Sequence, residues 1–263
     1  MNVISVAVSG RGLVRPDEPV FRADDEALLR GRAAFETTRV YGGRPFLLDR
    51  HVRRLGASAE RLRLATPDPD ECARLAQVVV DAAGAADLAL RLYWTGMTLV
   101  ATAGAIDPAL DALRARGMRL AVVRWSTGAL AGAKSMSYAE NMGAQDVAAR
   151  QGADDALLVS REGIVLEAPT ANVWWREGER LLTPSLDLPI LAGVTRGLVL
   201  ELAEHATTEG VFPLERLLAA DEVFLCSSIR EVMPVAAVDG HGYEVGRAAR
   251  ALQEQLRAQA LRS

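Results

Sequence analysis

The chain has 263 residues, of which 50% are hydrophobic and 24% are charged, and its formal net charge is −4. This composition is typical of a globular protein and leaves room for one large domain or two modest ones. Acidic and basic residues are interspersed, so no basic patch predicts binding of nucleic acid. No run of about eighteen apolar residues predicts a membrane span.

Cysteine and histidine usage excludes several kinds of site. Cys72 and Cys226 are far apart and form no CxxC pattern. The three histidines, His51, His205 and His241, are scattered, so we expect no metal site. The N-terminal residues lack a basic stretch followed by a long apolar run, so we expect no signal peptide and a reducing, cytoplasmic location.

The first half of the chain alternates short strands and helices, which is typical of an α+β domain. In chain order we expect a strand at 3–8, a turn-rich connection at 10–19, a short helix at 24–32, a hairpin of 35–41 and 45–48, helices at 49–62 and 70–83, a hairpin of 88–94 and 98–102, and a short helix at 108–116. Gly42-Gly43 predicts the first hairpin turn, and Asp49 is the expected cap of the helix that follows.

A change of domain is expected near Gly117, giving domains 1–116 and 117–263. In the second half we expect strands at 118–125, 222–226 and 234–238, hairpins of 156–160 with 164–167 and of 171–175 with 180–183, and helices at 137–150, 193–205, 214–219 and 245–261. Ser137 and Glu140 have the spacing of a capping box, and Gly152 suits the C-terminal end of the same helix.

Lys134 precedes this helix among small and apolar residues, and it is the only lysine in the chain. A lysine in such surroundings loses its proton more easily than an exposed one, and a neutral amine forms a Schiff base with an aldehyde. Arginine cannot do this chemistry, so one lysine in an arginine-rich chain favours a catalytic role. Taken alone, the segment fits an exposed lysine before a helix better than a catalytic one, because catalytic lysines are rare among lysines.

Six short motifs occur in a distinctive order. They are Phe-Glu-Thr-Thr-Arg-Val at 35–40, His51-x-x-Arg54-Leu55, Gly-Ala-Lys134-Ser, Gly163-x-x-x-Glu167 with Asn172, Leu-Ala-Gly193-Val-Thr-Arg196, and Asp-Glu-Val-Phe followed by Ser-Ser and Glu231-Val-Met-Pro-Val235. In this order the chain resembles the fold-type IV pyridoxal-phosphate (PLP) enzymes, which include branched-chain and D-amino-acid aminotransferases and 4-amino-4-deoxychorismate lyases. The resemblance runs from about Gly31 to Gly240.

This resemblance implies that Lys134 binds PLP as a Schiff base and shuttles the proton at the substrate α-carbon. Glu167 is implied to pair with the pyridine nitrogen, which keeps the ring an electron sink. Asn172 is implied either to orient the loop after Glu167 or to contact the cofactor directly.

The resemblance also implies a set of donors for the phosphate. Arg54 would bind it bidentately, although Arg53 is adjacent and a solvated helix charge is the alternative. Val194 and Thr195 would offer N–H groups at a helix N-terminus. In the Ser-Ser turn, Ser228 matches a hydroxyl that contacts the phosphate, and Ser227 assists it.

On the substrate side the chain is most similar to the lyases. Arg30 stands where the aminotransferases place a tyrosine, and an arginine suits a substrate carboxylate. Thr38, in Thr37-Thr38, and Tyr138, four residues after Lys134, are the expected further catalytic residues, with helix packing as the alternative for Tyr138. Arg91 is a second expected substrate contact. A surface charge for Arg30 and a structural ion pair for Arg91 remain alternatives.

The resemblance implies a two-domain α+β fold like that of D-amino-acid aminotransferase, with a smaller N-terminal α/β sandwich and a larger C-terminal domain around a barrel-like core. It implies a homodimer acting on a small amino substrate. The expected activity is a PLP-dependent 4-amino-4-deoxychorismate lyase that releases pyruvate and 4-aminobenzoate in folate synthesis. The alternative is a D-amino-acid or branched-chain aminotransferase on the same scaffold.

Overall fold

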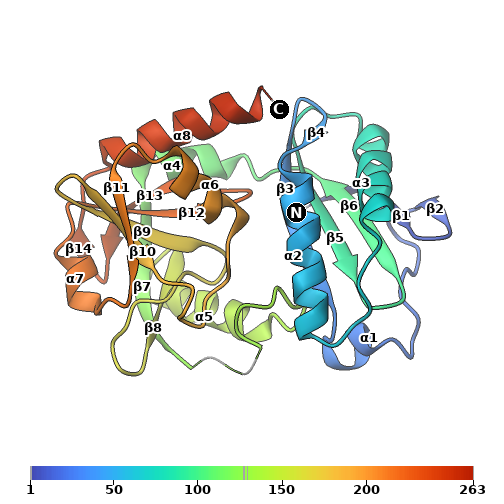
Figure 1. Ribbon diagram of the computed structural model, residues 1–263, viewed down its shortest axis with the longest axis horizontal. Helices are drawn as coiled ribbons and strands as arrows, with labels where there is room; N and C mark the ends of the chain where they lie inside the picture. Colours follow the sequence, from blue (N-terminus) through green and yellow to red (C-terminus); the bar gives the residue numbers. More distant parts are fainter. Residues whose placement is uncertain (1, 127, 129, 263) are drawn as a thin grey trace. The chain divides into compact units, whose positions relative to one another are not determined.

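The computed structural model describes residues 2–126, 128 and 130–262 (Figure 1). The chain forms two compact units: Met1–Asp107 with Gly132–Tyr138 and Ala260–Ser263, and Pro108–Ala131 with Ala139–Gln259. This division differs from the predicted boundary at 116/117. The segment around Lys134 belongs to the first unit because Phe35 N–H donates to the Lys134 carbonyl at 3.0 Å. None of the described helices is both long and apolar enough to cross a membrane.

The first unit is a sheet with two long helices on one face. Its strands are β1 (Val3–Val8), β2 (Gly12–Val14), β3 (Ala34–Tyr41), β4 (Arg44–Pro45), β5 (Leu88–Trp94) and β6 (Leu99–Gly104), and its helices are α1 (Glu26–Arg30), α2 (Leu48–Arg61) and α3 (Pro69–Ala83). Among the described residues the strand order is β2-β1-β6-β5-β3-β4, and every pairing is antiparallel.

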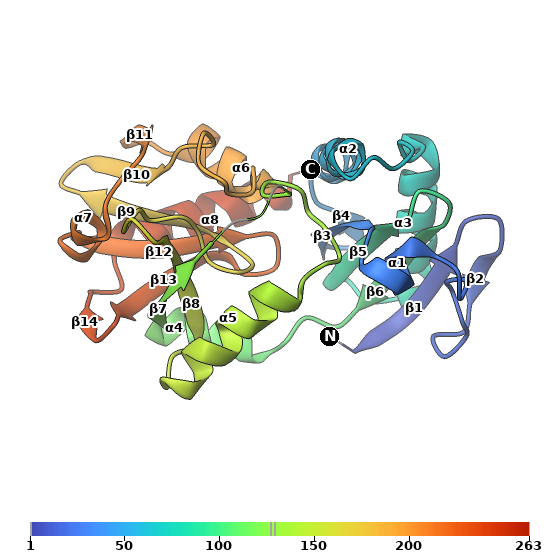
Figure 2. The same ribbon diagram turned by 90° about the horizontal axis from the view of Figure 1, so that it is seen from below.

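Strand periodicity explains the layers of this unit. Along β3, side chains alternate between buried and half-buried up to Val40. The buried set includes Ala34 and Val40, which join Val52 and Leu55 of α2 in one core cluster. Figures 1 and 2 show α2 and α3 on the same side of the sheet. The opposite side, here called the outer face, carries the half-buried set.

The second unit is built on a larger mixed sheet. Its strands are β7 (Met118–Trp125), β8 (Asp155–Ser160), β9 (Asn172–Glu177), β10 (Arg180–Pro184), β11 (Ala206–Gly210), β12 (Glu222–Ser227), β13 (Glu231–Val238) and β14 (His241–Gly242). Its helices are α4 (Ala109–Arg116), α5 (Ala139–Arg150), α6 (Val194–Leu202), α7 (Leu214–Leu218) and α8 (Arg247–Ala260).

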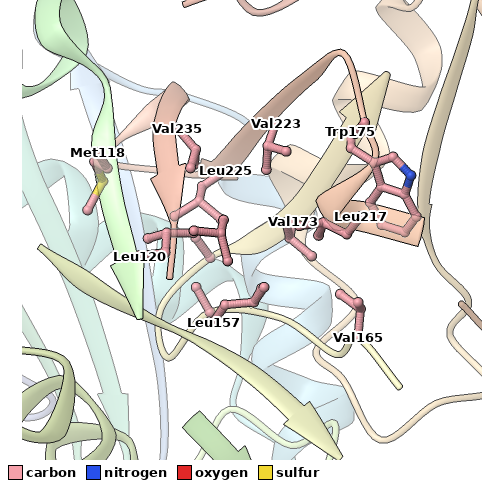
Figure 3. Packing of buried hydrophobic residues seen from close by; sticks show 14 of the residues in the cluster. Met118, Leu120, Leu157, Val165, Val173, Trp175, Leu217, Val223, Leu225 and Val235 are labelled. Carbon is pink, nitrogen blue, oxygen red and sulfur yellow. The ribbon is translucent and has the colours of Figure 1, made fainter. Parts of the chain in front are cut away.

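The strand order β11-β10-β9-β12-β13-β7-β8, with β14 beside β13, leaves β11 and β8 as edges among the described residues. Parallel pairings join β10 to β11, β13 to β7 and β7 to β8. Figure 3 shows side chains from several of these strands converging on one core that includes Val173, Trp175, Leu225 and Val235. The predicted two-domain α+β class is confirmed. The mixed sheet is the barrel-like core of the second unit, and its edge strands β11 and β8 do not pair with each other among the described residues.

Three local predictions need correction. The return strand at 45–48 is only the two residues of β4, because the chain turns into α2 at Leu48. Asp49 lies inside that helix, and the N-cap is Leu47, at φ 52°. Residues 206–210, predicted neither as helix nor as strand, form β11, which pairs in parallel with β10.

Candidate active site

Lys134 is held through both of its backbone groups within the first unit. Its N–H donates to the buried Ser58 hydroxyl of α2 at 3.1 Å, and its carbonyl accepts from Phe35 at 3.0 Å. A bridge between Ala34 and Ser135 extends this pairing. The Lys134 Nζ lies 4.5 Å from the centroid of the Phe35 ring. The amine is therefore presented from a fixed backbone, at the first residues of β3.

The residues after Lys134 close onto Gly31 instead of forming the predicted capping box. The Ser137 hydroxyl donates to the Gly31 carbonyl at 3.1 Å, and the helix begins at Ala139. Gly31 ends α1 at φ 66°, and a Cβ there would lie 2.6 Å from the Ser137 hydroxyl. Only glycine permits both the left-handed backbone and this close approach.

Arg54 points inward from α2, whereas its neighbour Arg53 pairs with Asp49 at the surface. The Arg54 guanidinium donates from Nε and Nη2 to the two carboxylate oxygens of Glu36, at 2.7 and 2.8 Å. His51 Nδ1 lies 2.7 Å from the same carboxylate. Glu36 and His51 are 1% and 2% exposed. The structure therefore separates the two arginines that the sequence left adjacent.

Opposing effects set the charges of this cluster. Burial alone would raise the pKa of Glu36, but the charge of Arg54 and the hydrogen bonds from Arg54 and His51 bring that pKa down to about 2. Burial lowers the pKa of His51, opposed by the hydrogen bond and charge of Glu36. Glu36 is therefore ionised and accepts only, so His51 is the neutral tautomer that donates from Nδ1.

Two of the predicted catalytic side chains occupy different positions relative to Lys134. Tyr138 packs edge-on against Phe35, with ring centroids 5.4 Å apart. Tyr138 and the Lys134 amine therefore both contact the Phe35 ring. The Thr38 hydroxyl donates to the Phe46 carbonyl at 2.6 Å and is buried on the helix-covered side of β3. This placement argues against a catalytic role for Thr38, because strand alternation turns Thr37 to the outer face instead.

The two arginines predicted to bind substrate also differ. Arg30 forms an exposed ion pair with Glu26 at 2.8 Å, one turn away on α1. Its substrate role stays a prediction, and this geometry favours the alternative of a surface charge. Arg91 lies on the outer face, where its strand register pairs it with Thr37 and Thr102. Arg91 Nε and Thr102 Oγ1 are buried and have no hydrogen-bond partner among the described residues.

In the second unit, Glu167 is fixed by a side chain and by the backbone. Its carboxylate accepts from Asn172 Nδ2 at 3.1 Å and from the Leu191 N–H at 3.2 Å. The same Asn172 amide donates to the Leu191 carbonyl at 2.9 Å. Asn172 thus links the loop before α6 to Glu167. Of the two roles that the sequence left open for Asn172, orienting the loop and contacting the cofactor, these contacts match the first.

Gly193 allows this arrangement, because a Cβ there would lie 2.0 Å from Asn172 Oδ1. It is also the N-cap of α6, so Val194 and Thr195 begin the helix. Their N–H groups belong to the first turn, which has no intrahelical acceptors and is a favourable place for an anion. Nearby Arg196 is buried and turned to the Pro184 carbonyl and to Glu209.

Ser227 is the last residue of β12, and Ser228 begins the turn to β13, so the pair lies at the strand end as the sequence predicts. The Ser227 hydroxyl accepts from the Arg230 N–H at 3.4 Å, and both serines are half-buried. Their hydroxyls are therefore near the surface of the second unit and not in its core.

The side chains present suit an aldehyde cofactor with a phosphate and a basic ring nitrogen. The first unit supplies a fixed amine and an inward guanidinium. The second unit, taken by itself, has a fixed carboxylate, a helix N-terminus and hydroxyl groups. Sequence reasoning missed three residues of the first unit: Glu36, which binds Arg54; Ser58, which binds the Lys134 backbone; and Thr37. Two signals for them were present in the sequence: Glu36 and Thr37 lie in the Phe-Glu-Thr-Thr motif, and Ser58 follows Arg54 by four residues on α2.

Comparisons with known proteins agree with this chemistry. Residues 33–238 match the amino-transferase class IV family. The chain is 29% identical to an aminodeoxychorismate lyase of Bacillus subtilis, over 94% of this chain and 92% of that protein. It is 32% identical to a bifunctional aminodeoxychorismate lyase / D-amino acid transaminase of Mycobacterium tuberculosis, over 87% of this chain and 89% of that protein.

A solved structure is also similar throughout. It is a hypothetical aminotransferase from Mycobacterium tuberculosis in its PLP-bound form, with a TM-score of 0.91 and 28% identity, covering 98% of this chain and 99% of that one. The ordered motifs and the fold thus agree with these comparisons. The chain belongs to the amino-transferase class IV family of PLP-dependent enzymes.

Proposed function

We propose that Lys134 carries the PLP, that Arg54 binds its phosphate and that Glu167 pairs with its ring nitrogen. The N–H groups of Val194 and Thr195 and the hydroxyls of Ser227 and Ser228 are the further phosphate donors. Support comes from the fixed backbone of Lys134 and from the hold of Asn172 on Glu167. Asn172 acts as a positioning residue in this scheme.

When bound, PLP withdraws electrons from the carbon that bears the substrate amine, so a proton on that carbon becomes acidic. The Lys134 amine takes this proton and holds it as an ammonium. The Phe35 ring, on whose edge Tyr138 packs, lies against one side of this amine.

A row of polar side chains on the outer face carries the choice of substrate. Thr37 and Arg91 are register partners on β3 and β5, and Arg39 follows two residues after Thr37. The row begins beside Phe35, over which Lys134 Nζ lies. Guanidinium groups suit carboxylates, and Arg91 Nε is a donor with no hydrogen-bond partner in the part of the chain that the structure describes. A substrate with two carboxylates fits this row better than an aliphatic amino acid.

The function best supported is therefore a 4-amino-4-deoxychorismate lyase. Lys134 removes the proton from the carbon bearing the amine and returns it to the methylene carbon of the departing enolpyruvyl group. The bond between ring carbon and ether oxygen breaks, pyruvate leaves, and the ring becomes 4-aminobenzoate. Atoms balance without an oxidant or reductant, and the gain of aromaticity drives the reaction.

A transaminase is the second candidate. The same Lys134 would move the α-proton of an amino acid, and the arginine row would bind a dicarboxylic 2-oxo acid. The specific support is that the Mycobacterium tuberculosis relative carries both activities in its name.

The test is to give the purified, PLP-loaded protein aminodeoxychorismate, or D-alanine or L-leucine with 2-oxoglutarate. We expect stoichiometric 4-aminobenzoate and pyruvate from the first mixture. Amino transfer without any lyase turnover would contradict the lyase assignment. Lys134→Ala is expected to lose both activities. Because Lys134 is the only lysine, borohydride reduction followed by peptide mapping must find the cofactor at this side chain.

We further propose that the protein acts as a homodimer. Leu28 and Leu29 of α1 are 65% and 59% exposed, and a partner subunit would cover these apolar side chains. Sedimentation at several protein concentrations measures the assembly, and a monomer at all of them contradicts the proposal. A cytoplasmic location stays a prediction.

A further inference from the structure

Glu36 is a fully buried carboxylate to which none of the roles above gives a purpose. It lies on the helix-covered side of β3, and its side chain is 2% exposed. A carboxylate buried this deeply is costly unless several donors satisfy it. Three donors do so: Arg54 Nε, Arg54 Nη2 and His51 Nδ1, all within 2.8 Å.

The hold of Glu36 on Arg54 is directional. A guanidinium is planar and has five N–H donors in a fixed arrangement. Glu36 takes two of them, along the edge formed by Nε and Nη2, which sets both the plane and the rotamer of Arg54. His51 stands three residues earlier on α2, on the same helix face, and fixes the carboxylate from the other side.

The charges within this cluster cancel. The Glu36 carboxylate offsets the Arg54 guanidinium, and burial keeps His51 neutral. The cluster thus has a formal charge of zero. Any preference of Arg54 for a phosphate must then come from correctly aimed N–H groups and not from net positive charge.

We propose that Glu36 is a positioning residue for phosphate binding, which acts by aiming the Arg54 guanidinium. This inference rests on the phosphate role proposed for Arg54. It makes a prediction opposite to that of a simple electrostatic view. If net charge controlled affinity, neutralising Glu36 would strengthen binding of a phosphate dianion. If orientation controls it, the same change weakens binding.

The experiment compares PLP with pyridoxal, which lacks the phosphate. The apo-protein is titrated with each compound, and binding is followed by absorbance. The dissociation constant of pyridoxal divided by that of PLP is the ratio that gives the contribution of the phosphate. We expect Glu36→Gln to reduce this ratio by roughly tenfold, the worth of one or two charge-assisted hydrogen bonds. Pyridoxal affinity should change little.

Two variants isolate the mechanism. In an Arg54→Gln background, adding Glu36→Gln should leave the ratio unchanged, because Glu36 acts only through Arg54. Glu177→Gln is the matched control: Glu177 binds Arg216 bidentately at 2.9 and 3.0 Å in the second unit, and its loss should leave the ratio as in the wild type.

If Glu36→Gln fails to fold, as judged by circular dichroism, Glu36→Asp replaces it. The aspartate keeps the charge but withdraws the carboxylate by one methylene, so it should also reduce the ratio. A ratio that is unchanged or higher in the Glu36 variant, while Arg54→Gln lowers it, overturns the inference alone. A ratio unaffected by Arg54→Gln overturns the proposed phosphate role of Arg54 itself.

Discussion

Two ionisable side chains buried in the first unit, Glu36 and His51, make its stability depend on pH. The pKa of Glu36 lies below its ordinary value of 4.5, at about 2, so its contribution is present above pH 4.5 and is lost as the pH falls toward 2. The pKa of His51 is also lowered, and protonation opposes folding of a buried neutral imidazole, so its contribution is lost as the pH falls below 6.5.

We therefore expect the free energy of unfolding to fall in two stages on acidification. In the Glu36 stage the free energy of unfolding should fall by on the order of 3 kcal/mol, which corresponds to the lowering of the Glu36 pKa from 4.5 to about 2. Urea midpoints measured across the acidic range give the profile. In Glu36→Gln the lower stage should disappear while other acidic groups still titrate. A lower stage of undiminished size in that variant would show that Glu36 is not its source.

At the level of elements, one face of α2 serves several parts of the candidate site. His51 and Arg54 reach Glu36 on β3, and Ser58, one turn after Arg54, binds the backbone of Lys134. Residues three and four apart share a helix face, so α2 presents all these groups on one side. The helix thus connects Arg54, the proposed phosphate donor, to the backbone of Lys134, the proposed carrier of the cofactor.

Ser58→Ala tests this connection. The change removes the acceptor of the Lys134 N–H, which should cost about 1 kcal/mol of stability. It should also reduce the amount of cofactor attached at Lys134, measured by borohydride trapping and mass spectrometry. Ser185→Ala is the control, since Ser185 forms comparable local hydrogen bonds with Asp187 in the second unit. Lower stability with unchanged trapping would make Ser58 a purely structural residue.

At the scale of the whole molecule, each unit has its own core. Leu90 is buried in the first core and Leu225 in the second, and neither cluster needs the residues of the other. Unfolding of such a chain need not be a single transition.

We expect Leu90→Ala and Leu225→Ala each to destabilise their own unit by roughly 2–5 kcal/mol, because each leaves a cavity in a close-packed core. Hydrogen exchange with mass spectrometry should locate the loss of protection in the strands of the altered unit. Equal loss of protection in both units after either substitution would contradict two separate cores.

Local sequence features were enough to predict most elements and the family. Hydrophobic periodicity and glycine turns located nearly every strand and helix, and Lys134, Glu167, Asn172 and the helix start at Gly193 were found from the order of their motifs. These features are readable because each depends on neighbours a few residues away, through capping, turn geometry or strand alternation. β11 escaped because its residues, Ala-Thr-Thr-Glu-Gly, are mostly exposed and show no alternation of apolar and polar side chains.

Only the tertiary structure decided which side chains meet. Arg53 and Arg54 are adjacent in the sequence, where only the His51-x-x-Arg54 motif favours Arg54, and burial against Glu36 separates them. Thr37 and Thr38 are likewise adjacent, and the packing of α2 on one side of β3 decides which faces outward. The hold of Ser58 on Lys134 joins residues 76 positions apart. Periodicity determines that a strand has two faces, but which face a helix covers depends on long-range packing.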